Sequence, residues 1–347
     1  QLLINFKNID ISVINHEYIE ILKSSFGNKI KYRKRFNNIT LFKDKNNFHD
    51  YKKSLEFIKK LPKHLPKTKK FIEKNFSDYS FFISDYVPEV FKIGEDLKIP
   101  TFGVCHYTWS WYFNKNNNKD KAIIKLLKKY ESSATKTYFP PFTAPAIFRN
   151  YKNKNYKDVG LIIKKTKIIE KINVKKTFLL MDNGTKLLSK FITNIVPQIS
   201  KNKNYNFYVG ISSLNNKTKK IINESKNLTP VTGLKGIYSS INKVDHVIAR
   251  GGFNTLTECL LFKKPSIFIN ERFNPEVKTN IKIISKKKLG STTQLENLDI
   301  NFMKKLDKFL QKEKNTIKKN FSKLNLSYNG ALEIVNDIKK ELKLKNL

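Results

Sequence analysis

The sequence predicts an α/β protein built from two doubly wound domains. The clearest sign is a strand, a glycine turn, a helix and a second strand between residues 244 and 269. A helical connection of this kind joins two parallel strands of one sheet. Residues 81–106 form a second strand–helix–strand unit, with Pro100 before its second strand. A chain of 347 residues also has the length of two ordinary domains.

The first predicted domain covers residues 1–146. We expect strands at 9–14 and 80–84, and a lysine-rich helical region at 50–76 that Pro62 and Pro66 interrupt. After the unit at 81–106, residues 121–130 have the spacing of a basic amphipathic helix. The proline-rich segment 139–150 then predicts the approach to the link between the domains.

The second predicted domain covers residues 147–347 and continues the same alternation. We expect strands at 159–163, 177–181, 205–210, 244–249 and 266–269, a further apolar segment at 230–234, and helices at 166–173, 216–224 and from 254. From about residue 303 to the end, the chain has a helical, lysine-rich pattern.

The charge is strongly positive, with 68 Lys and Arg against 29 Asp and Glu and a net charge of +39. Such an excess is typical of proteins that bind nucleic acid or anionic membranes. The lysines are scattered among asparagines and isoleucines rather than gathered in a basic tail, so we expect no specific nucleic acid partner. Cys105 and Cys259 lie in apolar surroundings, which gives no sign of a disulfide framework or a cysteine metal site.

The glycine turn has the chemistry of a phosphate site. Gly251 and Gly252 let the backbone approach a ligand closely. The amides of the next three residues open a helix, whose N-terminus carries partial positive charge. These residues are Phe253, Asn254 and Thr255.

Thr255 and Glu258 share one face of the first helical turn, where a hydroxyl could reach a phosphate oxygen and a carboxylate could bind a ribose diol. The same spacing also fits a capping box, in which both side chains only satisfy helix amides. The sequence leaves both interpretations open.

A longer motif resembles a known family. Arg250 to Glu258, the apolar strand that follows, and the segment with Asn274, Glu276 and Asn280 are similar to the donor-site motif of GT-B glycosyltransferases. The nearest resemblance is to the family containing MurG (glycosyltransferase 28 C-terminal domain) and to the glycosyltransferase-like half of L-arabinokinase. The resemblance implies two Rossmann-like domains facing a cleft, with terminal helices that pack back across both.

The resemblance also assigns roles to residues. The glycine turn and helix start would hold the diphosphate of a UDP-sugar, Glu258 the ribose, and the later polar segment the sugar. The donor-binding residues it implies are Asn183, Gly184, Gly233, Leu234, Arg250, Gly251, Gly252, Phe253, Asn254, Thr255, Glu258, Asn274, Glu276 and Asn280.

Two residues of the first domain are candidate catalytic groups. Asp85 and His106 follow neighbouring predicted strands, so we expect both at one edge of the sheet. The resemblance places a histidine at the position of His106 in the cleft. The alternatives are a helix N-cap for Asp85 and a hydrogen-bonded strand-end histidine for His106. The opening strand and glycine loop of GT-B enzymes have no counterpart here, so either the sequence is a fragment or that start is lost, and the usual base is not assigned.

The predicted function is therefore transfer of a hexose or N-acetylhexosamine from a nucleotide diphosphate sugar to an unidentified glycan, lipid-linked or small-molecule acceptor. No P-loop, zincin, hydrolase-elbow or Asp-x-Asp motif occurs, so we expect no metal and no cofactor besides the donor. The alternatives are a non-hydrolysing sugar epimerase and a noncatalytic protein that binds nucleotide sugars or polyanions.

We expect a cytoplasmic protein, because no apolar run has transmembrane length and no signal peptide precedes the first strand. Peripheral contact with the inner face of the membrane is a further hypothesis. It rests on the aromatic residues at 107–113 and the basic helix 121–130. The alternative is that the aromatic rings are core and the helix an ordinary surface helix.

Overall fold

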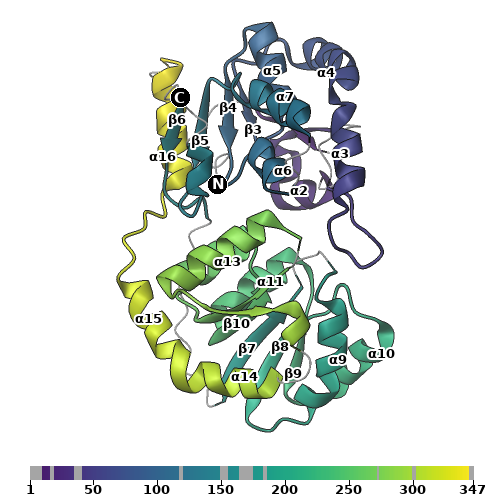
Figure 1. Ribbon diagram of the computed structural model, residues 1–347, viewed down its shortest axis with the longest axis vertical. Coiled ribbons are helices and arrows are strands. Elements are labelled where there is room, and N and C mark those ends of the chain that lie inside the picture. Colours follow the sequence, from purple (N-terminus) through teal and green to yellow (C-terminus); the bar gives the residue numbers. More distant parts are fainter. Residues whose placement is uncertain are drawn as a thin grey trace. The chain divides into compact units, whose positions relative to one another are not determined.

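The computed structural model describes residues 10–15, 19–34, 41–116, 120–148, 155–163, 175–182, 186–271, 273–298 and 302–343. The chain forms two compact units (Figure 1). The first comprises residues 1–42, 50–164 and 326–347, and the second comprises 43–49 and 165–325. This division differs from the predicted boundary at 146/147, because residues 147–164 and the last helix belong to the first unit.

The first unit is built on parallel strands. Its four-stranded sheet has the order β3-β4-β5-β6, and a separate pair joins β1 to β2, also in parallel. The strands are β1 (Ser12–Asn15), β2 (Lys31–Lys34), β3 (Phe82–Ser84), β4 (Thr101–Val104), β5 (Lys136–Phe139) and β6 (Tyr156–Asp158).

Helices surround these strands. They are α2 (Ile19–Phe26), η1 (Gly27–Lys29), α3 (Tyr51–Lys59), α4 (Leu61–Phe76), α5 (Pro88–Leu97), α6 (Trp109–Asn116), α7 (Lys121–Glu131), α8 (Pro145–Phe148) and α16 (Gly330–Glu341). Helix α5 packs against β3 and β4, α2 packs against β2, and others pack on neighbouring helices. The amphipathic pattern of α7 is confirmed: Ile123, Ile124 and Leu127 are buried.

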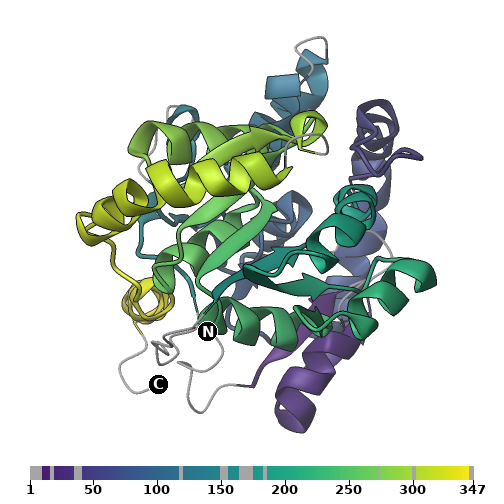
Figure 2. The same cartoon turned by 90° about the horizontal axis from the view of Figure 1, so that it is seen from below.

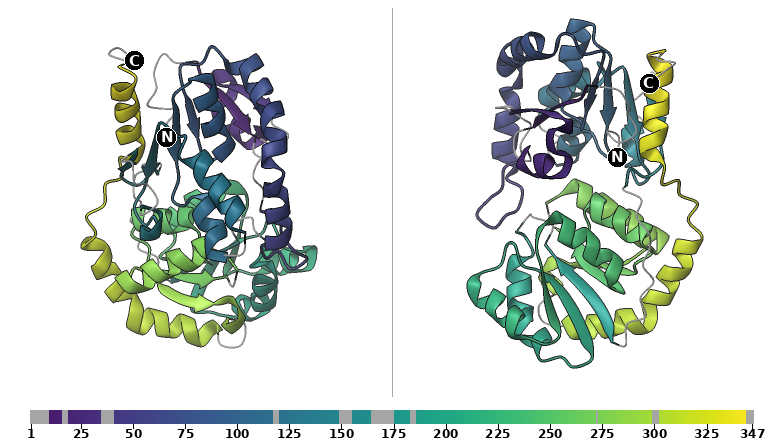
Figure 3. Two further views of the ribbon diagram at one scale, coloured as in Figure 1. Left: turned by 45° about the horizontal axis from the view of Figure 1, so that its top comes forward. Right: turned by 180° about the vertical axis from the view of Figure 1, so that it is seen from behind.

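The last helix joins the first unit through polar and apolar contacts. Figure 3 shows α16 alongside β6. Asp337 accepts from Lys136 Nζ at 3.0 Å, Lys157 Nζ at 2.6 Å and Tyr138 Oη at 2.9 Å. Ile334, Val335 and Ile338 pack against the buried rings of the sheet. The C-terminal residues therefore complete the fold of the domain that begins the chain.

The aromatic cluster at 107–113 is mainly core. Trp111, Tyr112 and Phe113 are at most 4% exposed, and Trp109 donates its indole N–H to the Tyr86 carbonyl at 2.8 Å. Tyr107 and Trp109 are only half-buried. The interpretation of these rings as core is confirmed for three of them, which removes most of the aromatic surface that membrane contact would use.

The second unit has a six-stranded parallel sheet in the order β12-β11-β10-β7-β8-β9. Its strands are β7 (Lys176–Met181), β8 (Tyr205–Gly210), β9 (Leu228–Val231), β10 (His246–Arg250), β11 (Ser266–Asn270) and β12 (Ser291–Gln294). The chain extends from β7 to one side as β8 and β9, then returns to the other side of β7 as β10. The sheet is thus doubly wound, with its switch point between β7 and β10.

Helices lie on both faces of this sheet (Figure 2). They are α9 (Ser189–Ser200), α10 (Asn216–Glu224), α11 (Gly233–Lys243), α12 (Phe253–Leu261), α13 (Pro275–Lys287), α14 (Phe302–Lys308) and α15 (Lys314–Ser322), with short η2 (Leu295–Asn297) and a π-helical turn, η3 (Phe309–Glu313). None of the helices in the described part of the chain is long and apolar enough to cross a membrane.

The sequence placed most of these elements correctly. Parallel pairing of the strands at 244–249 and 266–269 is confirmed by β10 and β11, and the strand at 205–210 by β8. The predicted strand at 159–163 is wrong: its apolar residues are buried in extended chain, whereas the strand is β6, just before them. The predicted helix at 166–173 lies outside the described residues.

Candidate functional site

The glycine turn lies at the carboxyl edge of the second sheet. Arg250 ends β10, which stands between β7 and β11, and α12 begins at Phe253 directly after the turn. The turn therefore adjoins the switch point, where open α/β sheets leave a crevice for ligands.

Close packing explains the first glycine of this turn. The amide of Gly251 donates to the Ile269 carbonyl at 3.0 Å, and a Cβ atom there would stand 2.7 Å from Ile281 Cδ1. Gly252 is the N-cap of α12, with its own amide bonded to the Arg250 carbonyl at 2.8 Å. The backbone is held against α13 in a way that a larger residue at 251 would disturb.

Arg250 forms a two-pronged ion pair with Glu271, which follows β11. Nε and an η nitrogen of the guanidinium donate to the two carboxylate oxygens at 2.6 and 3.0 Å. The side chains are 11% and 8% exposed, so the pair is well shielded from water. Sequence reasoning missed Glu271, although its position after a strand of the same sheet gave the signal.

The segment after β11 holds the glycine turn in place. Asn274 caps α13 by accepting from the Val277 amide at 3.2 Å. Glu276 accepts from the Phe253 amide at 3.3 Å, and Asn280 Nδ2 donates to the Gly251 carbonyl at 3.1 Å. The structure thus brings Glu276 and Asn280 to the backbone of the turn, whereas Asn274 caps its own helix; contact of the three residues with a donor sugar stays a prediction.

The structure does not form the capping box that the sequence allowed. The helix begins two residues before Thr255, and Gly252 caps it without a side-chain hydrogen bond. Thr255 is buried within the first turn, whereas Asn254 is exposed. Thr255 and Glu258 are therefore interior helical residues rather than a cap.

Glu258 has an environment that is unusual for a surface carboxylate. The residue is half-buried, and no hydrogen bond joins its carboxylate to any part of the chain that the structure describes. Desolvation raises the pKa of Glu258 to about 7. A group with this pKa exchanges its proton near neutrality and would be stabilised as an anion by a hydroxyl donor.

Gly233 and Leu234, two further predicted donor residues, come just after β9, the strand at the edge of the sheet. Gly233 opens α11 with a φ of 64°, a conformation that suits glycine, and Leu234 follows it in the helix. Asn183 and Gly184 lie outside the described residues. Asp182, just before them, directly follows β7 and accepts from Ser189 Oγ at 3.0 Å and Ser213 Oγ at 3.3 Å.

The part of the chain that carries the glycine turn matches a known family. Residues 183–342 match the glycosyltransferase family 28 C-terminal domain. MurG of Acinetobacter baumannii has a similar structure, with a TM-score of 0.61 at 12% identity, covering 96% of this chain and 91% of that one. Residues 183–342 therefore resemble the glycosyltransferase family 28 C-terminal domain, and the whole chain has the GT-B fold that MurG has.

Other glycosyltransferases share the fold. CalG4, the calicheamicin glycosyltransferase, gives a TM-score of 0.68 at 11% identity, covering 97% of this chain and 92% of that one. Phytolacca americana UGT2, complexed with UDP-2fluoro-glucose and pterostilbene, gives a TM-score of 0.67 at 11% identity. The match covers 99% of this chain and 94% of that one. No curated protein matches the sequence significantly. The predicted GT-B fold is thus confirmed.

The two predicted catalytic residues follow neighbouring strands of the first sheet. Asp85 follows β3 and His106 lies two residues beyond β4, and these strands pair in parallel with Ser84 opposite Gly103. Desolvation by neighbouring atoms raises the pKa of Asp85, although part of the residue is exposed to solvent. The charge of His106 acts in the opposite direction. Ser84, rather than Asp85, accepts from the Val87 amide at the start of α5, at 2.8 Å.

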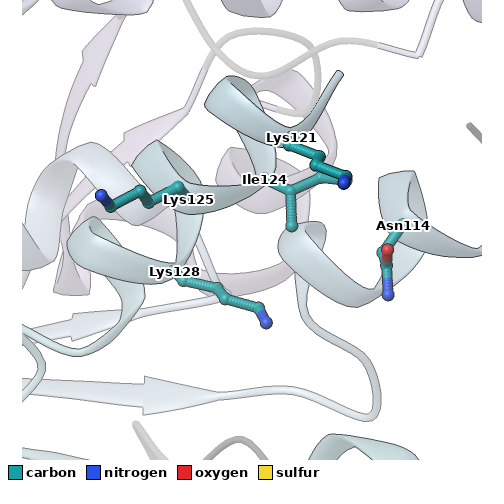
Figure 4. A pocket seen from close by; sticks show the side chains of 5 residues that line it. All are labelled: Asn114, Lys121, Ile124, Lys125 and Lys128. Atoms are coloured by element: carbon teal, nitrogen blue, oxygen red, sulfur yellow. The ribbon is translucent and has the colours of Figure 1, made fainter. Parts of the chain in front are cut away.

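A pocket of about 600 Å³ in the first unit has a basic lining (Figure 4). Its residues come from α6 and α7, and they are Asn114, Lys121, Ile124, Lys125 and Lys128. Three ammonium groups around one hollow favour an anionic ligand over a neutral one.

The described residues contain no group of three or more His, Cys, Asp and Glu side chains that could hold a metal ion. The expectation of metal-free chemistry stays a prediction, which only an activity measurement can test.

Proposed function

We propose that this glycosyltransferase moves a hexose or N-acetylhexosamine from a UDP-sugar to an acceptor hydroxyl. The observation that carries the proposal is the carboxylate of Glu258, half-buried and without a hydrogen bond to the described chain, less than two helical turns after a glycine turn. A ribose diol supplies two hydroxyl donors, which is what a desolvated carboxylate lacks. The donor bound by Phytolacca americana UGT2 is of the same class.

The diphosphate would bind at the start of α12. The Phe253 amide already donates to Glu276, so the amides of Asn254 and Thr255 are the groups that the helix offers to phosphate oxygens. Their partial positive charge would stabilise the leaving diphosphate as its negative charge develops. Gly233 and Leu234 would contact the base, and Asn183 and Gly184 the phosphates, as the family resemblance implies.

The reaction breaks the bond between the anomeric carbon and the diphosphate oxygen, and forms a bond from that carbon to the acceptor oxygen. The bonding pair leaves with UDP, and the acceptor proton passes to a base. Asp85 and His106 are the candidates of the first unit for this role, with His106 as base and Asp85 as its partner. This scheme needs neither a metal ion nor a cofactor beyond the donor.

The buried ion pair would make the site rigid. Because Arg250 is held by two hydrogen bonds to Glu271, the strand end that leads into the glycine turn has one conformation before the donor arrives. Glu276 and Asn280 hold the same turn from α13, whose N-terminus Asn274 caps. Prearranged amides cost less to align in the transition state.

Calorimetry with a panel of nucleotides tests the donor class. UDP, UDP-glucose and UDP-N-acetylglucosamine should bind, and GDP should bind more weakly. Absence of binding to every uridine nucleotide would refute the proposal. Conversion of the UDP-sugar to its epimer without an acceptor would instead identify an epimerase, and salt-sensitive binding of short DNA without UDP binding would identify a polyanion-binding protein.

We also propose that the protein is cytoplasmic and contacts anionic lipid through α7. The support is the lysine-lined pocket and the exposed lysines of this helix, since its apolar side is buried in the core. Each lysine near an anionic surface contributes about 1 kcal/mol. Neutralising Lys121, Lys125, Lys128 and Lys129 should reduce co-sedimentation with anionic vesicles, whereas neutralising Lys217 and Lys220 of α10 should not. Equal effects of the two sets would contradict a specific surface.

A further inference from the structure

Residues 43–49 form a tight loop that belongs to the second unit, although the chain on both sides of it belongs to the first. Lys43 and His49 pair across its base as an antiparallel bridge. The carboxylate of Asp44 accepts from the amides of Asn46 at 2.8 Å and Phe48 at 2.9 Å. The loop therefore has a defined shape of its own.

One aromatic contact fixes this loop to the second unit. The rings of Phe48 and Phe273 meet edge to face, with 5.8 Å between their centroids. Phe273 lies between β11 and α13, in the segment that also holds Glu271 and Glu276. The loop thus lies beside the residues that support the glycine turn.

The residues at the base of the loop lie within electrostatic range of the ends of β7, β10 and β11. His49 lies within electrostatic range of Glu271, Arg250 and Glu276. Lys43 lies within electrostatic range of Arg250, Asp182 and Glu271 at three strand ends, and of Lys186. Asp182 directly follows β7 and Arg250 ends β10, so Lys43 lies near the switch point of the sheet, where such folds bind ligands.

The charges at this point favour an additional anion. Arg250 is already compensated by Glu271 through two hydrogen bonds. Desolvation, with the nearby charge of Arg250, lowers the pKa of Lys43, although Asp182 and Glu271 act in the opposite direction. A phosphate bound beside such a lysine would stabilise the charged form that its surroundings destabilise. Desolvation also lowers the pKa of His49.

We propose that loop 43–49 completes the donor site, with the Lys43 ammonium binding the diphosphate of the nucleotide sugar at the switch point. This inference rests on the proposed function, and it adds a group from outside residues 183–342, the stretch that matches the family domain. The helix amides would hold the diphosphate from the α12 side and Lys43 from the β7 side. The sequence gives no hint of this, because KDKNNFH has the composition of an ordinary polar loop.

Replacement of Lys43 by Met tests the assignment, with Lys45→Met as the matched control. Lys45 lies two residues away in the same loop and is exposed, as Lys43 is, so the two substitutions remove the same charge at similar exposure. We expect Lys43→Met to weaken UDP binding about tenfold or more, with Lys43→Arg retaining most of the affinity. The affinity for uridine, which has no phosphate, should stay the same in all three variants, as measured by NMR titration. Phe48→Ala, which removes the ring that fixes the loop, should weaken UDP binding in the same direction as Lys43→Met.

The outcomes separate this inference from the proposed function. UDP binding to Lys43→Met within twofold of the unchanged protein would overturn the role of Lys43 and leave the donor assignment intact. An equal loss for Lys45→Met would show a general charge effect and would also overturn it. Failure of the unchanged protein to bind UDP would refute the donor assignment and this inference together.

Discussion

The substitution Glu258→Gln distinguishes two roles of this residue, either binding the ribose through its carboxylate or only occupying one face of the helix. Two hydroxyl donors to an anion would be lost in part, since glutamine keeps one acceptor oxygen and turns an amino group toward the other hydroxyl. A hydrogen bond to a charged group contributes about 1.5–3 kcal/mol, so UDP binding should weaken about 10- to 150-fold. The capping function cannot explain such a loss, because Gly252 caps α12.

The raised pKa of Glu258 gives the same prediction a second readout. Because the pKa is about 7 in the folded protein, a large fraction of the carboxyl groups are protonated near neutrality. Binding of a diol to the anion lowers this pKa, so UDP binding at pH 7 should release protons. In calorimetry, the binding enthalpy should then depend on the ionisation enthalpy of the buffer. Glu258→Gln should lose this part of the dependence and keep the part due to the phosphate.

The raised pKa of Glu258 should make the protein less stable as the pH rises, which is opposite to the effect of an ordinary salt-bridged carboxylate. The folded pKa lies above the unfolded value of 4.5, so the folded state holds its proton more tightly. The free energy of unfolding should therefore fall as the pH rises from 4.5 to 7, by up to about 3 kcal/mol. Glu258→Gln should lack this loss, and Glu224→Gln, at an exposed site of α10, should retain it. Unchanged UDP affinity and an unchanged pH profile in folded Glu258→Gln would refute the ribose role.

Three further predictions concern the support of the site and the core of the same unit. Glu271→Gln leaves the shielded Arg250 without its charge partner and should lower the free energy of unfolding by about 3 kcal/mol in urea titrations; a change below 0.5 kcal/mol would contradict the pairing. Gly251→Ala forces a Cβ against Ile281 and should cost about 1–3 kcal/mol, with partial recovery in a double variant carrying Ile281→Val. Desolvation lowers the pKa of His246 to about 4, so stability should fall by roughly 3 kcal/mol as the pH drops from 6.5 to 4, and His246→Gln should remove that slope.

Local patterns in the sequence predicted much of the second unit. The glycine turn, the strand before it and the helix after it follow from apolar spacing and from residues that break strands, and β10, α12 and β11 confirm them. The predicted strand at 159–163 is wrong because an apolar run indicates burial but does not show which segment it packs against. Leu161 is fully buried, but its amide bonds to the Ser327 carbonyl at 2.8 Å rather than to a strand.

Local sequence patterns could not predict contacts between segments that lie far apart in the chain. The capping box fits residues 255–258 by spacing, yet Glu276, from the next helix, binds the Phe253 amide instead. The role of Glu271 could be recognised only from its ion pair with Arg250. The role of loop 43–49 could be recognised only from its contact with the second unit. Asp85 and His106 were placed correctly at one edge because parallel strands fix that edge, whereas their chemistry depends on neighbours that spacing cannot show.

A crystal structure of the protein with UDP would show directly how the nucleotide binds. We predict the ribose hydroxyls within hydrogen-bond distance of Glu258, and phosphate oxygens at the Asn254 and Thr255 amides with the Lys43 ammonium beside them. UDP bound elsewhere in the protein, or at the turn with its ribose hydroxyls beyond hydrogen-bond reach of Glu258, would contradict this prediction.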